Sequence, residues 1–281
     1  MPPPTATAAV SAPPAITTAV ARGGPWWAAW ADLVRFRPST AIQTDVKSRS
    51  SKWYIHKIED AWGDINIDLY PVDVSSVPSG MTAESLLEHV RTNINFFVNP
   101  GLSRFDPYDD KYPPATFDDK KYWLSSAPES AVISIMMRMG RMPGALILSD
   151  GLLPSFLNPD DGSVVCAQKE SNYWIFSTLY TDEDKGHPVS GNRQFGFIEN
   201  PKGSGYIFFT RGADRATAML DDFPITPVFF FADLLWKSFQ ARLVSYIKAA
   251  GGSAASSSPI SERVYWPAVK IVAWHPTVPW L

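Results

Sequence analysis

The chain has 281 residues, of which 45% are hydrophobic and 19% are charged, and its formal net charge is −3. This composition supports a substantial core and excludes a chain that is disordered throughout. The near-neutral charge and the lack of a basic run argue against a nucleic-acid partner. No apolar run reaches the roughly 18 residues of a transmembrane helix.

The single cysteine, Cys166, excludes an intramolecular disulfide and a cysteine-based metal cluster. The sequence predicts neither a metal site nor a cofactor. The N-terminus lacks the charged start and apolar core of a secretory signal peptide, so a cytoplasmic location is expected. Secretion without a signal peptide is the alternative.

Three regions follow from composition. Residues 1–25 are Pro, Ala and Thr with little else, which predicts a disordered tail. Residues 26–252 form a single predicted α+β domain, which begins with a short amphipathic helix near residues 26–34. Residues 253–281 are expected to form a C-terminal tail packed on the surface.

The first predicted strands cover residues 53–58 and 64–70. The second alternates strictly between polar and apolar residues, which is typical of a half-buried strand. Its polar side carries Asp64, Asn66 and Asp68. These residues and His56 allow a metal site on one face, but alternation toward solvent explains the pattern more simply.

A helix is predicted from an N-cap at Thr82 to Phe97. The following residues 101–124 read as a loop rich in Asp, Pro and Tyr. The carboxylate pairs at 109–110 and 118–119 alternate with lysines, which favours a solvated surface over acid–base or metal chemistry.

Further strands are expected beyond this loop, at residues 131–137, 145–149, 163–168, 173–180, 194–199 and 206–210. The last two form a hairpin, because Asn, Pro and Gly in residues 200–205 supply turn geometry. A long helix with an apolar stripe starts at Thr226 and stops at Gly251-Gly252.

This order of strand, helix, antiparallel strands and long final helix resembles the helix-grip fold of the START-like superfamily, over roughly residues 64–250. The resemblance implies α+β architecture, with an antiparallel sheet of about seven strands wrapped around the C-terminal helix. It places the second short helix of that family in residues 101–124. It also implies an apolar cavity between the sheet and the helix residues Trp236, Phe239, Leu243 and Tyr246. It implies no catalytic residues.

In an antiparallel meander, alternate connections fall at the same end of the sheet. The loops 153–161 and 181–192 and a turn at 211–215 should therefore lie together. This end would collect Asp160, Asp161, His187, Asn192, Arg193, Arg211, Asp214 and Arg215. A cavity with apolar walls and a few convergent polar groups is the default site hypothesis. The alternative is a set of exposed ion pairs at a helix start.

The sequence therefore predicts a soluble protein that binds a hydrophobic or amphipathic small molecule. Arg193, Arg211 and Arg215 would hold an anionic or polar end of the ligand, because the guanidinium fork binds such groups. His187 and Asp214 are the candidate catalytic residues and would orient that end. An enzyme such as a cyclase, isomerase or hydrolase would use His187 as general base.

Two other classes of protein stay open. A Pro/Ala/Thr tail before one compact domain fits a secreted bacterial effector or toxin domain. The many tryptophans near both termini fit an interaction module.

Overall fold

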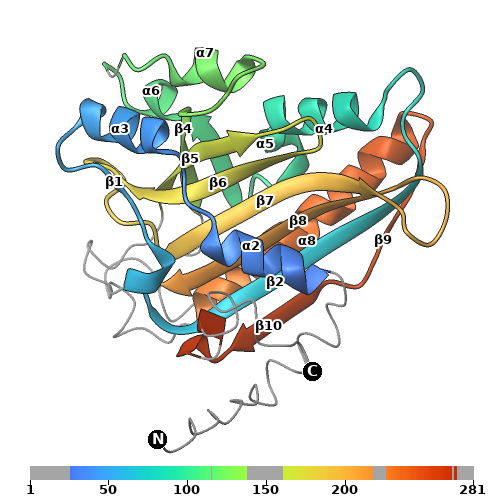
Figure 1. Ribbon diagram of the computed structural model, residues 1–281. Coiled ribbons are helices and arrows are strands. Elements are labelled where there is room, and N and C mark those ends of the chain that lie inside the picture. The colour runs from blue at the N-terminus through green and yellow to red at the C-terminus, as the bar shows by residue number, and fades with distance from the viewer. Residues whose placement is uncertain (1–25, 115, 138–160, 218–225, 268, 271–281) are drawn as a thin grey trace, which may run out of the picture.

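The computed structural model describes residues 26–114, 116–137, 161–217, 226–267 and 269–270. These residues form one large antiparallel sheet with helices on both faces (Figure 1). The predicted tail at 1–25, the predicted strand at 145–149 and Asp160 lie outside the described residues.

Helices and strands are interspersed in the first half of the chain, and among the described residues β4 to β8 then follow one another before the long helix α8. The strands are β1 (Tyr54–Ile55), β2 (Trp62–Ser76), β3 (Ser103–Pro107), β4 (Val132–Met137), β5 (Asp161–Lys169), β6 (Tyr173–Tyr180), β7 (Val189–Glu199), β8 (Tyr206–Ala216), β9 (Ser253–Ser256) and β10 (Ile260–Val264). The helices are α2 (Trp26–Arg35), α3 (Thr40–Arg49), η1 (Ile58–Asp60), α4 (Ala83–Thr92), α5 (Ile94–Phe97), α6 (Tyr108–Lys111), α7 (Asp119–Leu124) and α8 (Thr226–Ala249).

The sheet runs in the order β10-β2-β8-β7-β6-β5-β4-β3. The first long strand, β2, therefore lies beside β8, the last strand before α8. Helices α4 and α5 connect β2 to β3, and α8 crosses one face of the sheet (Figure 1). This is the helix-grip arrangement, so the predicted fold class is confirmed. The second short helix after β2 is α5, which follows α4 directly. The prediction that it lies in residues 101–124 was wrong.

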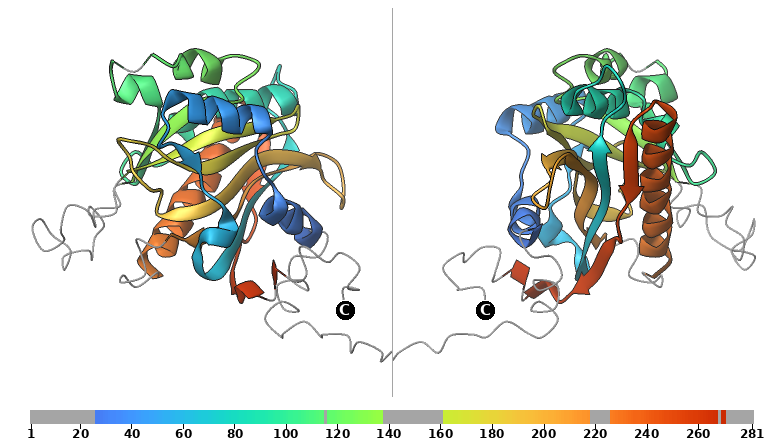
Figure 2. Two further views of the ribbon diagram at one scale, coloured as in Figure 1. Left: turned by 60° about the vertical axis from the view of Figure 1, so that its left-hand side comes forward. Right: turned by 90° about the vertical axis from the view of Figure 1, so that its right-hand side faces the viewer.

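Both faces of the sheet are covered (Figure 2). On one face, Phe195, Trp236 and Phe239 belong to a large core between the strands and α8. On the other face, Trp30 and Leu33 of α2 pack over a second core. A strand in this sheet therefore buries both of its sides, and polar residues on either side must find partners within the protein.

The predicted hairpin is confirmed and is longer than expected. β7 and β8 pair continuously from Val189↔Ala216 to Glu199↔Tyr206, with the turn at residues 200–205. Residues 211–215 lie inside β8 and do not form the predicted turn. Their side chains consequently alternate between the two faces of the sheet.

The two predicted irregular regions contain regular structure. Residues 101–124, expected as a loop, contain β3, α6 and α7. Asp119, expected on a solvated surface, is buried and accepts hydrogen bonds from the Arg49 side chain and from the Val132 backbone, both at 2.8 Å. The expected surface tail after residue 252 contributes β9 and β10, which pair with β2.

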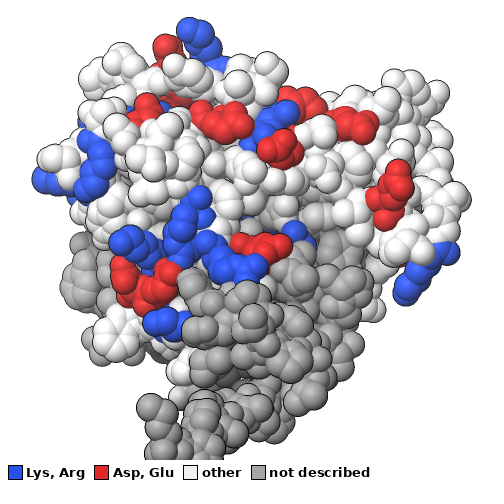
Figure 3. Space-filling view, viewed as in Figure 1, with Lys and Arg blue, Asp and Glu red and all other residues white. Residues whose placement is uncertain are grey.

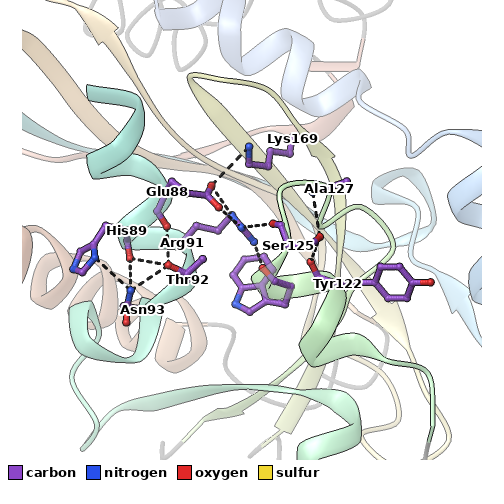
Figure 4. A network of polar contacts seen from close by, with 10 residues as sticks. Glu88, His89, Arg91, Thr92, Asn93, Tyr122, Ser125, Ala127 and Lys169 are labelled. Atoms are coloured by element: carbon purple, nitrogen blue, oxygen red, sulfur yellow. Dashed lines mark hydrogen bonds and ion pairs between the residues drawn. The ribbon is translucent and has the colours of Figure 1, made fainter. Parts of the chain in front are cut away.

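A buried arginine fixes the helical layer beside the sheet (Figure 4). The Arg91 guanidinium lies 4.8 Å from the Trp123 ring centre and donates a hydrogen bond of 2.7 Å to the Ser125 carbonyl. It also pairs with Glu88 one turn earlier in α4, and Lys169 of β5 approaches the same carboxylate at 3.7 Å. These contacts join α4, the end of α7 and β5.

The N-cap predicted at Thr82 is confirmed. Its side chain accepts a hydrogen bond from the Ser85 backbone amide, and the Ser85 side chain accepts one from the Thr82 amide. This capping box fixes the start of α4.

Candidate functional site

A cavity of about 100 Å³ lies between the sheet and the first turns of α8. Its apolar walls come from β3 to β6 and from α8, and include Phe105, Met137, Phe176, Leu235 and Trp236. We call this space the inner cavity. Its volume suits a small ring or a few water molecules.

The polar lining of the inner cavity comes from one end of β6, β7 and β8. Gly191 of β7 pairs with Asp214 of β8, and its amide donates to the Thr178 hydroxyl of β6 at 3.0 Å. Arg193 and His187 line the same space. The predicted gathering of His187, Arg193 and Asp214 is thus present.

Arg193 lies at the centre of a buried charged cluster. Its Nη2 atom is 2.7 Å from Asp68 Oδ2 and 3.9 Å from Asp214 Oδ2. Its guanidinium also lies 4.3 Å from the Trp236 ring centre. Asp68 further accepts from the Gly212 amide at 2.9 Å and from the Asn66 side chain at 3.0 Å. We call Asp68, Arg193 and Asp214 the charged cluster.

The cluster depends on the glycine at position 212. A Cβ atom there would lie 2.3 Å from Arg193 Nη2 and 3.1 Å from Asp214 Oδ2. The Arg193 guanidinium therefore passes over β8 at Gly212, where there is no side chain to block it. A glycine inside a strand often marks such a close approach.

The Asp214 carboxyl is electrostatically unusual. Burial, together with the neighbouring Asp68 carboxylate, raises the pKa of Asp214 above its ordinary range, although Arg193 acts in the opposite direction. With Asp214 protonated, the Asp68 carboxylate and the Arg193 guanidinium balance each other. The cluster is then neutral overall and can offer a carboxylic O–H to the cavity.

Burial shifts the pKa of His187 downward, whereas it shifts that of Asp214 upward. Burial lowers the pKa of His187 to about 3, so its imidazole is neutral at pH 7. Its Nδ1 atom is 3.0 Å from the Val189 carbonyl oxygen and 3.2 Å from the Val189 amide nitrogen. A ring with this low pKa is a weak base, and the general-base role of His187 stays a prediction.

Arg211 and Arg215 lie on the other face of the sheet and do not join Arg193. The Arg211 Nε atom donates to the Gln194 side chain at 2.7 Å, and burial lowers the pKa of Arg211 to about 10. Arg215 donates to the Gly63 and Ile58 carbonyls and lies 4.4 Å from the Trp266 ring centre. The prediction placed both in a turn, whereas strand alternation turns them away from the cavity.

Of the four α8 residues predicted to line the cavity, one does so and three lie elsewhere. Trp236 lines it. Phe239 and Leu243 are buried in the core beside it. Tyr246 lies farther along the helix and stacks on His89 at 4.9 Å.

Two further residues expected at this end have structural partners. The Asn192 side chain donates to the Leu33 carbonyl at 2.9 Å and so anchors α2. Asp161 pairs with Lys111 at 3.1 Å.

Sequence reasoning missed Asn66 and Asp68, which it placed toward solvent. Both are buried, because the polar side of β2 faces the α8 layer and not water. Alternation alone cannot reveal this, since either face of a strand can be covered. The available signal was Gly212, which lies directly opposite Asp68 in the sheet.

No three His, Cys, Asp or Glu side chains of the described residues lie close enough together to hold a metal ion. Within the same residues, no helix is both long and apolar enough to cross a membrane.

No protein family model and no curated protein matches this sequence. Among solved structures, the chain is similar to the di-domain ARO/CYC StfQ from the steffimycin biosynthetic pathway, with a TM-score of 0.34 and 10% sequence identity. The match covers 68% of this chain and 52% of that one, so this chain spans about half the length of that protein. A likeness at this TM-score carries no conclusion about activity, and the helix-grip arrangement rests on the strand order itself.

Proposed function

We propose that this protein binds a small, largely apolar molecule in the inner cavity, with a neutral polar group of the ligand directed at Asp214. The observation that supports this most directly is the composition of the cavity wall. Apolar side chains from four strands and α8 surround it, and the few polar groups converge from neighbouring positions of β6 to β8. Such a combination is typical of small-molecule sites.

The charged cluster favours a neutral polar group over an anion. Asp68 already pairs with Arg193 at 2.7 Å, and Arg211 and Arg215 are on the far side of the sheet. Among these three arginines, a ligand carboxylate would therefore meet no uncompensated cation. A carbonyl or ether oxygen could accept a hydrogen bond from the protonated Asp214 carboxyl.

The same geometry supports a catalytic variant of this proposal. A carboxyl whose pKa is raised toward neutrality can both give and take a proton at physiological pH. Asp214 would act as the acid or base on the bound molecule, and Arg193 would position it. Asp214→Asn keeps a hydrogen-bond donor but cannot transfer a proton, so it should retain binding and lose turnover.

The test is native mass spectrometry of the protein purified from its own source, compared with the denatured mass. We expect an additional small-molecule mass that disappears on denaturation. Ala232 lines the inner cavity, so Ala232→Leu fills part of the space and should abolish that mass. Ala241 is exposed on the same helix, and Ala241→Leu is the matched control that should retain it.

Retention of the same ligand by the Ala232→Leu variant would contradict the proposal. So would a bare native mass, if the purified protein also fails to take up apolar compounds from a soluble fragment library.

A further inference from the structure

A second cavity, of about 630 Å³, lies on the opposite side of the sheet from α8. We call it the outer cavity. Its walls come from α3, from β1 and the residues that follow it, and from the start of β7. The side chains that matter here are Lys47, Tyr54, His56, Lys57, Tyr180 and Ser190.

Two buried polar atoms of the outer cavity lack partners. Ser190 is 2% exposed, and its Oγ atom has no hydrogen-bond partner among the described residues. The same holds for the buried Nε2 atom of His56. An unsatisfied buried polar group costs about 1–3 kcal/mol, and folded proteins contain few of them. Neither atom is open to solvent, so a bound molecule gains these two hydrogen bonds when both side chains rotate toward the cavity.

The His56 imidazole is a neutral group that can form hydrogen bonds. Its backbone amide donates to the Thr178 carbonyl at 2.9 Å, which fixes the residue beside β6. Burial lowers the pKa of His56 to about 4, so the ring is uncharged at pH 7 and can carry a proton on Nε2.

The wall and rim of the outer cavity add aromatic surface and positive charge. Tyr54 stacks on Tyr180, with ring centres 5.2 Å apart, and is 45% exposed. Lys47 and Lys57 are exposed lining residues, and Asp60 is the one carboxylate among the lining residues described. Figure 3 views the molecule from the side of α2 and α3, where basic and acidic side chains are interspersed. Among the described lining residues, the two lysines therefore exceed the aspartate by one positive charge.

We propose that the outer cavity is a second binding site that takes an aromatic carboxylate. The Ser190 hydroxyl and the His56 Nε2–H donate to the carboxylate, and Lys47 and Lys57 balance its charge. The aromatic ring of the ligand packs against Tyr54. This site is distinct from the inner cavity, where Asp68 already pairs with Arg193.

Calorimetric titration of the full chain with 4-hydroxybenzoate tests the proposal, with 4-hydroxybenzyl alcohol as the uncharged control. We expect the carboxylate to bind and the alcohol to bind far more weakly. Ser190→Ala should weaken carboxylate binding about tenfold, the effect of one lost hydrogen bond to a charged group. His56→Phe keeps a ring of similar shape and should weaken binding to a comparable extent.

Ser190→Ala should leave the melting temperature unchanged or raise it, because the hydroxyl has no partner to lose. Ser177→Ala is the matched control in the neighbouring strand, where the hydroxyl donates to Asn192 at 2.6 Å. That variant should lower the melting temperature and retain binding.

Three outcomes would overturn the proposal. The first is no binding of 4-hydroxybenzoate at millimolar concentration. The second is equal binding by the wild type, Ser190→Ala and His56→Phe. The third is loss of binding in Ala232→Leu, which alters only the inner cavity and would assign the carboxylate to that site.

Discussion

The Arg193 guanidinium lies 4.3 Å from the centre of the Trp236 ring. Arg193 belongs to β7 and Trp236 to α8, so this contact joins the sheet to its long helix at the wall of the inner cavity. Because the same guanidinium pairs with Asp68, three elements meet at one side chain. A shift of Arg193 would therefore move both the Trp236 wall of the cavity and the polar groups beside it.

Replacing Arg193 by Met should destabilise the protein by about 3–5 kcal/mol, because it leaves two carboxyl groups buried without their cation. Urea denaturation measures the change. Arg104→Met is the control, since Arg104 forms an exposed pair with Asp106 and should change stability by less than about 0.5 kcal/mol. Equal midpoints for the two variants would mean that the charged cluster contributes little to stability.

Gly212→Ala should displace the Arg193 side chain, because the new methyl group would lie 2.3 Å from Nη2. We expect a loss of about 1–3 kcal/mol in stability, as for other overpacked sites, and weaker binding in the inner cavity. At Gly203, a Cβ would meet nothing within 4 Å, so Gly203→Ala should be neutral. An unchanged Gly212→Ala variant would show that the arginine can move aside freely.

The lowered pKa values of His187 and His56 predict how stability depends on pH. Burial lowers the pKa of His187 to about 3 and that of His56 to about 4, from an ordinary value of 6.5. The unfolded chain therefore binds more protons than the folded protein below pH 6.5. Their contribution to stability is complete above pH 6.5 and is lost as the pH falls toward 4.

For His187 the loss should approach about 1.4 kcal/mol per pH unit below pH 6.5. His187→Asn should flatten the measured curve of unfolding free energy against pH, and a double variant with His56→Asn should flatten it further. Parallel curves for the wild type and the double variant would contradict the neutral, buried state of both rings.

Removing residues 253–281 should destabilise the domain and cause self-association. β10 pairs with β2 from Ile65 to Leu69, and its loss would expose the β2 edge. Gln240 also donates to the Ser257 carbonyl at 3.3 Å, which would be lost. Light scattering and thermal melting measure both effects. Removing residues 1–25, for which the sequence predicts disorder, is the control that should leave the melting temperature unchanged.

The sequence was informative where patterns are local. The period of β7 and β8, their turn and the N-cap at Thr82 all follow from neighbouring residues, and the element order led to the correct fold class. It was uninformative about which side of β2 is covered, because Asp68 meets Arg193 only through strand pairing across the sheet.

The candidate site was predicted only in part, because local patterns show which strands pair but not where each strand ends. His187, Arg193 and Asp214 do come together, because hairpin pairing alone places them near one another. Arg211 and Arg215 were misplaced because the length of β8 was underestimated. A strand that continues through residues 211–215 assigns successive side chains to opposite faces, and no local signal marks where β8 ends.

The position of β2 in the sheet also sets constraints on how the protein folds. β2 comes early in the chain, yet its three partner strands, β8, β9 and β10, come late. Pairings between such distant segments form slowly, because the long intervening loop must close first. On the ribosome, β2 must remain without sheet partners until β8 has emerged. Its second edge stays open until β9 and β10 follow. A nascent chain of this protein is therefore expected to be most prone to aggregation late in synthesis.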